Sequence, residues 1–155
     1  MPLPTVTTFQ ELKLMIQTLR KEGVTVGLHC CSNADWRSIL SMELNYLSLD
    51  TSLSLDSLLT SAQQELVNFL DRGGRLSLGV IPTGRSSALR SLNAQELFVD
   101  LKSQLLAGLE SETRVRQVLE QALYTPACGL ALQSIPDAEL ISDTLREFFT
   151  LTRAS

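Results

Sequence analysis

The sequence predicts an α/β protein in which about four parallel strands alternate with flanking helices. Apolar segments of strand length recur at 24–28, 46–49, 75–81 and 122–124. Between them lie helix-length segments in which apolar residues return every three or four positions. Each connection is long enough for a crossover, and crossovers of this kind make neighbouring strands parallel and right-handed.

The composition is typical of one folded domain. Of the 155 residues, 44 % are apolar and 19 % are charged, so the chain is long enough to bury most of its apolar surface. We expect a single domain at 1–155, made of a leading helix in 1–22 and four strand–helix units in 23–155. The net charge is −4 and the basic residues are scattered, which argues against nucleic acid or an anionic membrane as a partner.

No apolar segment reaches the roughly 18 residues that a membrane-spanning helix needs. The sequence also lacks the basic start and apolar stretch of a secretory signal. Of the three cysteines at least one must stay unpaired, and adjacent Cys30 and Cys31 make a poor disulfide framework. We therefore expect a reduced, cytoplasmic protein.

The elements follow from capping signals and breaks in the apolar pattern. The leading helix is expected at 8–21, because Glu11 stands at capping-box spacing from Thr8 and Gly23 follows the end. It is a candidate cover for an edge of the sheet. The next elements are expected as strand 24–28, helix 34–43 capped by Ser32 or Asn33, strand 46–49, helix 56–72 capped by Asp56, strand 75–81, helix 93–109, a helical turn or two at 111–119, strand 122–124 and helix 136–149.

Four candidate metal ligands follow the predicted strands. His29 and Cys31 come after the first strand, Asp50 after the second and Cys128 after the fourth. The carboxyl ends of parallel strands carry the active sites of α/β proteins, so these residues fall on one rim. In extended chain His29 and Cys31 also leave on the same face. Imidazole and thiolate are zinc ligands, so the pattern indicates a possible zinc site.

Each of these residues also has a structural interpretation. A cysteine after a strand is commonly a small buried residue, and His29 could bond a backbone carbonyl. Asp50 precedes Thr51 and Ser52 and could cap a helix or turn. The spacing matches no zinc-finger pattern, so spacing alone favours the structural interpretation. The stretch Gly84-Arg85-Ser86-Ser87 lacks the pattern of a phosphate loop and reads as a plain connection.

Four segments together resemble a known family. They are Leu28-His29-Cys30-Cys31, Leu47-Ser48-Leu49-Asp50, Leu78-Gly79-Val80-Ile81-Pro82-Thr83 and Thr125-Pro126-Ala127-Cys128-Gly129-Leu130-Ala131. In this order they resemble the C-terminal half of the cobalamin-independent methionine synthases, which are uroporphyrinogen decarboxylase-like barrels. The resemblance spans about 24–149 and is closest to the short, single-barrel members.

The resemblance implies half of a (βα)₈ TIM-type barrel and a zinc-dependent methyltransferase that activates a thiol such as homocysteine. By motif, His29, Cys31 and Cys128 would be the zinc ligands. Asp50 stands where the family commonly has a glutamate, and its shorter side chain leaves two roles open: a fourth ligand, or a group that orients His29. Cys30 would point to the opposite face and serve packing.

A complete barrel needs eight strands, and this chain supplies about four. We therefore expect a second half-barrel as partner, either a second copy of the chain or a separate one, because an open parallel sheet leaves edges and faces uncovered. The alternative is a non-catalytic half-barrel remnant that acts as a zinc-binding or partner-binding subunit.

Overall fold

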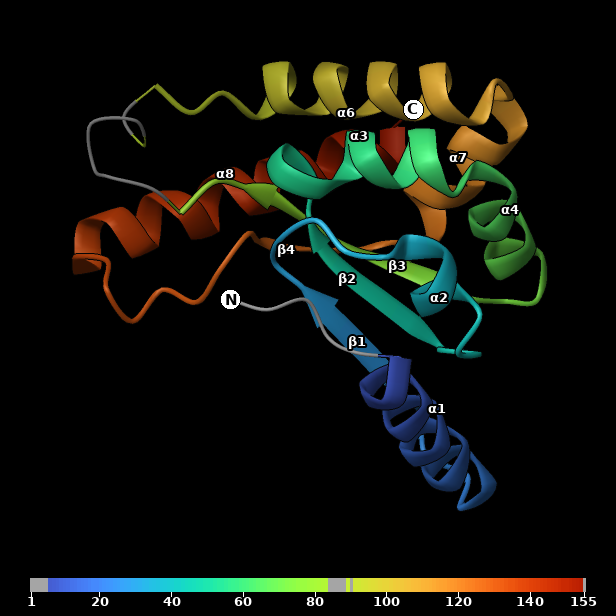
Figure 1. The fold of residues 1–155 in the computed structure, drawn as a ribbon. Helices are drawn as coiled ribbons and strands as arrows, with labels where there is room; N and C mark the ends of the chain where they lie inside the picture. The colour runs from blue at the N-terminus through green and yellow to red at the C-terminus, as the bar shows by residue number, and fades with distance from the viewer. Residues whose placement is uncertain (1–5, 84–88, 90, 155) are drawn as a thin grey trace.

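A parallel sheet of four strands runs through the computed structural model, which describes residues 6–83, 89 and 91–154 (Figure 1). The elements in chain order are α1 (Val6–Lys21), β1 (Gly27–Cys30), α2 (Trp36–Leu40), β2 (Tyr46–Asp50), α3 (Thr51–Ser61), α4 (Gln63–Asp71), β3 (Arg75–Ile81), α6 (Ala94–Leu109), α7 (Glu112–Gln121), β4 (Leu123–Pro126) and α8 (Ile135–Ala154). The prediction of an α/β fold with four parallel strands and flanking helices is confirmed. Across the described residues no helix is both long enough and apolar enough to cross a membrane.

The strands lie in the sheet in the order of the chain, β1-β2-β3-β4, and every neighbouring pair is parallel. This order decides where the helices go. A right-handed crossover to the next strand along always places its helix on the same face, whereas a doubly wound sheet reverses direction and uses both faces. The crossover helices therefore lie on one side of the sheet.

The helices accordingly form one layer. α6 lies at its centre and packs against α3, α4, α7 and α8, while α2 packs against α3 and α4. In Figure 1, α3 and α6 are stacked over the strands. The apolar side chains beneath them include Leu47, Leu49 and Leu78, each fully buried. Burying one such side chain contributes about 1.5–3 kcal/mol, so this interface stabilises the fold.

The opposite side of the sheet is different, and we call it the polar face. It is defined by alternation and register as Gly27, His29, Tyr46, Ser48, Asp50, Arg75, Ser77, Gly79, Leu123 and Thr125. None of these residues belongs to the hydrophobic core. A parallel sheet usually has both faces covered, and its strands then read as nearly continuous apolar runs. The alternation in Leu47-Ser48-Leu49-Asp50 is the sequence signal that only one face is packed here.

α1 lies next to β1 and apart from α3 and α6, as Figure 1 shows. Its Ile16 is 1 % exposed and belongs to the same core. Gln10 and Lys13 line a shallow hollow together with Ser38 and Ser41 from the α2 region. α1 therefore covers the core beside β1, while β1 itself has β2 as its hydrogen-bonded neighbour in the sheet.

Two predicted helices differ from the structure. The helix expected at 56–72 begins earlier, because Asp50 instead of Asp56 is its N-cap. It is also divided into two helices, α3 and α4, because the backbone of Ala62 leaves the helical region at φ −143°. The helix expected at 34–43 is shorter and is capped by Asp35, whose Oδ1 accepts a hydrogen bond from the Ser38 amide at 3.2 Å. The two wrong starting residues have the same cause: several side chains near each helix start can accept the capping hydrogen bond, and tertiary contacts decide which of them does.

Smaller shifts affect the ends of elements. β1 starts three residues later than expected, so His29 lies inside the strand, and β4 extends to Pro126. α1 begins at Val6, so Thr8 lies within it and the expected cap there is wrong. The stretch Gly84-Arg85-Ser86-Ser87 and the lead-in at 1–5 lie outside the described residues.

A glycine in β3 tests the packing between β3 and the segment after β4. A Cβ added at Gly79 would lie 2.8 Å from the Ala127 Cα, which is backbone and cannot swing away. We expect Gly79→Ala to lower the free energy of unfolding by about 1–3 kcal/mol, measured by urea denaturation. Gly129→Ala is the matched control, because nothing lies within 4 Å of its added Cβ. Equal effects of the two substitutions would contradict this packing.

Candidate functional site

The four candidate ligands lie along the carboxyl rim of the sheet. His29 is the third residue of β1, and Cys31 follows in a bend directly after that strand. Asp50 is the last residue of β2, and Cys128 lies in the bend after β4. Because neighbouring strands are about 4.8 Å apart, β1 and β4 are separated by about 14 Å along the sheet.

His29 is held by the neighbouring strand. Its Nδ1 lies 2.9 Å from the Ser48 hydroxyl, and the two residues are register partners on β1 and β2. In the tautomer with the proton on Nδ1, the ring donates to Ser48 and the Nε2 lone pair remains free for a ligand bond. From the sequence, Asp50 was expected as the group that could orient His29, and Ser48 was missed. The sequence signal that could have identified Ser48 was its position two residues before Asp50, because alternate residues of a strand lie on the same face of the sheet.

Asp50 has a structural role that its sequence context allowed. It is the N-cap of α3, and its Oδ1 accepts hydrogen bonds from the Ser52 amide at 2.9 Å and the Ser52 hydroxyl at 2.6 Å. The side chain is only 7 % exposed. Both capping hydrogen bonds go to Oδ1, and within the described residues Oδ2 accepts no hydrogen bond. The capping interpretation is confirmed, and a ligand role stays a prediction.

The three cysteines are free thiols of two kinds. Cys31 and Cys128 are exposed on the rim, whereas Cys30 is half-buried and packs against the core. Burial raises the pKa of the Cys30 thiol, and the neighbouring charge of Cys31 raises it further. The prediction that Cys30 serves packing is confirmed.

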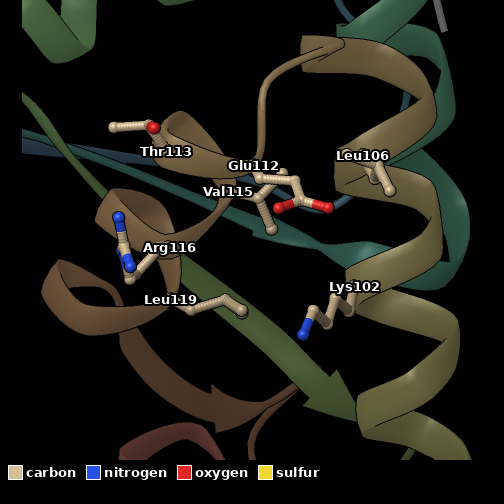
Figure 2. Close-up of a pocket in the computed structure, with 7 residues that line it drawn as sticks. All are labelled: Lys102, Leu106, Glu112, Thr113, Val115, Arg116 and Leu119. Carbon is tan, nitrogen blue, oxygen red and sulfur yellow. The ribbon is translucent and has the colours of Figure 1, made fainter. Parts of the chain in front are cut away.

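Two hollows deserve comparison with this rim. A pocket of about 150 Å³ lies at the ends of β2 and β3, where Asp50, Ser52 and Gly79 meet Asp100 and Gln104 of α6. A second, of about 260 Å³, lies between α6 and α7, where Lys102 and Glu112 point into the gap (Figure 2). The second hollow contains none of the candidate ligands. The rim pocket is the better candidate for a small molecule, because parallel α/β proteins bind ligands at the carboxyl ends of their strands.

The structure brings the four residues to one rim without clustering them. Among the described residues no group of three or more His, Cys, Asp or Glu side chains is placed to hold a metal ion. His29 is hydrogen bonded to Ser48 and Asp50 to Ser52. The assignment of His29, Cys31, Asp50 and Cys128 as zinc ligands therefore stays a prediction.

Comparisons of the chain with protein-family models, with curated proteins and with solved structures gave no match.

The two roles of Asp50 separate by substitution. Asp50→Ala removes the cap of α3 and is expected to cost about 0.5–2 kcal/mol of unfolding free energy, while Asp50→Asn caps nearly as well and costs little. Asp56→Ala, at an exposed position on the same helix, is the control. Urea denaturation measures all three. A loss for Asp50→Asn as large as for Asp50→Ala would show that the cap is not the main role.

The thiols are expected to differ in reactivity. In chelator-treated protein at pH 8, iodoacetamide should modify Cys31 and Cys128 faster than Cys30, because burial shields Cys30 and its raised pKa keeps it protonated. Raising the pH should narrow the difference in modification rate between Cys30 and the two exposed cysteines, since the Cys30 thiolate forms at higher pH. Peptide mapping by mass spectrometry gives each rate. Modification of Cys30 at the rate of Cys128 would refute its packed position.

Proposed function

We propose that the chain is half of a (βα)₈ barrel whose rim binds zinc and activates a thiol, such as homocysteine, for methyl transfer. The observation that carries the proposal is the collection of nitrogen and sulfur donors on one rim. Two separate strand ends, those of β1 and β4, supply them, and one of the donors, His29, is already oriented by Ser48. The sequence resemblance to the methionine synthase family suggests the reaction class.

The winding of the sheet supports the barrel assignment. Sequential parallel strands with their crossover helices in one layer are the arrangement of a (βα)₈ barrel, and a doubly wound fold would have helices on both faces. The polar face would then be part of the barrel interior. Four strands are half the number that a closed barrel requires.

The donor types match those that zinc takes, although β1 and β4 lie about 14 Å apart along the sheet. His29 Nε2 and the exposed thiols of Cys31 and Cys128 are borderline and soft donors of the kind that zinc takes, and three protein ligands leave one position open. Zinc bound there would lower the pKa of a coordinated substrate thiol, so that the thiolate persists at neutral pH. Asp50 would supply a fourth oxygen through Oδ2, or leave that position to the substrate.

The other rim residues hold this arrangement in place. Ser48 fixes the His29 ring through Nδ1, which is the kind of outer contact that sets a ligand's tautomer. Ser52 fixes the Asp50 carboxylate, and Thr51 ties the same turn to β3 through its hydrogen bond to the Gly79 carbonyl at 2.9 Å. The exposure of Cys31 and Cys128 leaves room for a thiol to approach.

The competing function is a non-catalytic half-barrel that binds zinc or a partner. It is favoured by the small rim pocket and by the lack of a ligand cluster in the described residues. Both functions suit a reducing compartment such as the cytoplasm, since all three cysteines are free.

Metal content tests the site. Protein purified without chelator is expected to carry close to one zinc per chain, because three N and S ligands suffice for tight binding. His29→Ala and Cys128→Ser should each weaken zinc affinity about tenfold or more. Cys30→Ala is the control, because Cys30 packs against the core. Absence of zinc, or a zinc affinity that Cys128→Ser leaves unchanged, would rule the site out.

A methylation assay then separates the two functions. Zinc-loaded protein is offered homocysteine with methylcobalamin or methyl-folate as donor, and methionine is measured by mass spectrometry. Methionine formation that is lost in Cys128→Ser supports the methyltransferase. Zinc binding without methionine formation supports the non-catalytic subunit.

A further inference from the structure

We propose that two copies of this chain associate head to tail, with the β4 edge of each copy pairing with the β1 edge of the other. The two seams are related by a two-fold axis, so the assembly closes at two copies and eight strands. The inference rests on the half-barrel assignment of the proposed function but needs no metal. It is argued from the edges, the exposed apolar side chains and the charges of the terminal helices.

The sheet ends in two parallel edge strands. Among the described residues, β1 and β4 each have one neighbour in the sheet. Both are less buried than β3, in which every residue after Arg75 is buried. Exposed edge strands present unpaired backbone groups and tend to pair with another chain. Because the sheet is wound to one side, an identical sheet turned by the two-fold axis presents β4 to β1 in the parallel direction.

Many exposed apolar side chains belong to the elements next to these two edge strands. Nine of the twelve large apolar side chains exposed in the described residues lie on α1, β4 or α8 or in the segments that adjoin them. Those at the β1 end are Leu14, Met15, Leu19 and Val24, and those at the β4 end are Leu123, Leu132, Ile135, Leu140 and Phe149. Leu132 is 97 % exposed and Ile135 is 78 % exposed. Exposed apolar groups of this size are typical of interaction surfaces, and here they belong to the elements that precede β1 and follow β4.

The helices that would meet at each seam have opposite charge. α1 precedes β1 and α8 follows β4, so pairing of β4 with β1 of the other copy brings α8 beside that copy's α1. α1 carries Lys13, Arg20 and Lys21 against Glu11. α8 carries Asp137, Glu139, Asp143 and Glu147 against Arg146 and Arg153. A basic helix beside an acidic one favours the head-to-tail pairing and disfavours α1 with α1 or α8 with α8.

The pairing makes a specific prediction at the rim. Within one chain Cys31 and Cys128 follow strands that are about 14 Å apart, but across a seam they follow adjacent strands about 4.8 Å apart. Both thiols are exposed. A short cross-linker should therefore join Cys31 of one copy to Cys128 of the other.

Cross-linking with single-cysteine chains tests this directly. Both chains carry Cys30→Ala; one also carries Cys31→Ser and the other Cys128→Ser, and both are kept in chelator. A short bis-maleimide is expected to give a covalent dimer in the mixture and none in either chain alone. Covalent dimers formed by either chain alone would overturn the head-to-tail arrangement. So would a chain with both Cys31 and Cys128 in which the reagent joins these two cysteines only within one copy.

The mass in solution provides the second measurement. Sedimentation equilibrium should give twice the chain mass, and Met15→Glu should weaken the association about tenfold or more by placing a charge in the seam. Leu53→Glu is the matched control: Leu53 is 61 % exposed on α3, away from both edges, and Met15 is 55 % exposed on α1. A chain that stays monomeric at all concentrations, or equal effects of the two substitutions, would overturn the proposal.

Discussion

The one-sided winding of the sheet is the constraint on which the rest of the structure depends. Sequential strand order and right-handed crossovers put the crossover helices in one layer, and that layer buries Leu47, Leu49 and Leu78. The same order leaves a polar face without core residues and two edge strands with one neighbour each. Core, rim and edges are thus three consequences of one topological choice.

The rim residues derive their positions from this sheet. His29 reaches Ser48 because parallel register places the two side chains on the same face of neighbouring strands. Asp50 ends β2 and begins α3 at once, so its carboxylate is fixed by Ser52 at the point where strand becomes helix. Such tight turns hold polar groups at the carboxyl edge with little freedom. The rigidity suits a ligand site, and it is equally what a stable cap requires.

Much of this architecture could be predicted from the sequence. The four strands and their parallel order follow from apolar segments separated by helix-length connections, and the rim position of His29, Asp50 and Cys128 follows from where those segments end. The start of α3 could not be predicted, because Asp50 and Asp56 are both plausible caps and only the contacts of Ser52 decide. Ser48 was missed for a related reason: a serine between two leucines becomes informative only once the register with β1 is known.

Zinc-edge X-ray absorption distinguishes the proposed thiol-activating rim from a rim with a purely structural role. A thiol-activating rim should show two sulfur ligands at about 2.3 Å and one nitrogen at about 2.0–2.1 Å in the zinc-loaded protein. Addition of homocysteine should add a third sulfur at about 2.3 Å, because a position is open and the substrate thiolate fills it. Zinc bound only by nitrogen and oxygen, or a ligand shell that homocysteine leaves unchanged, would contradict the account.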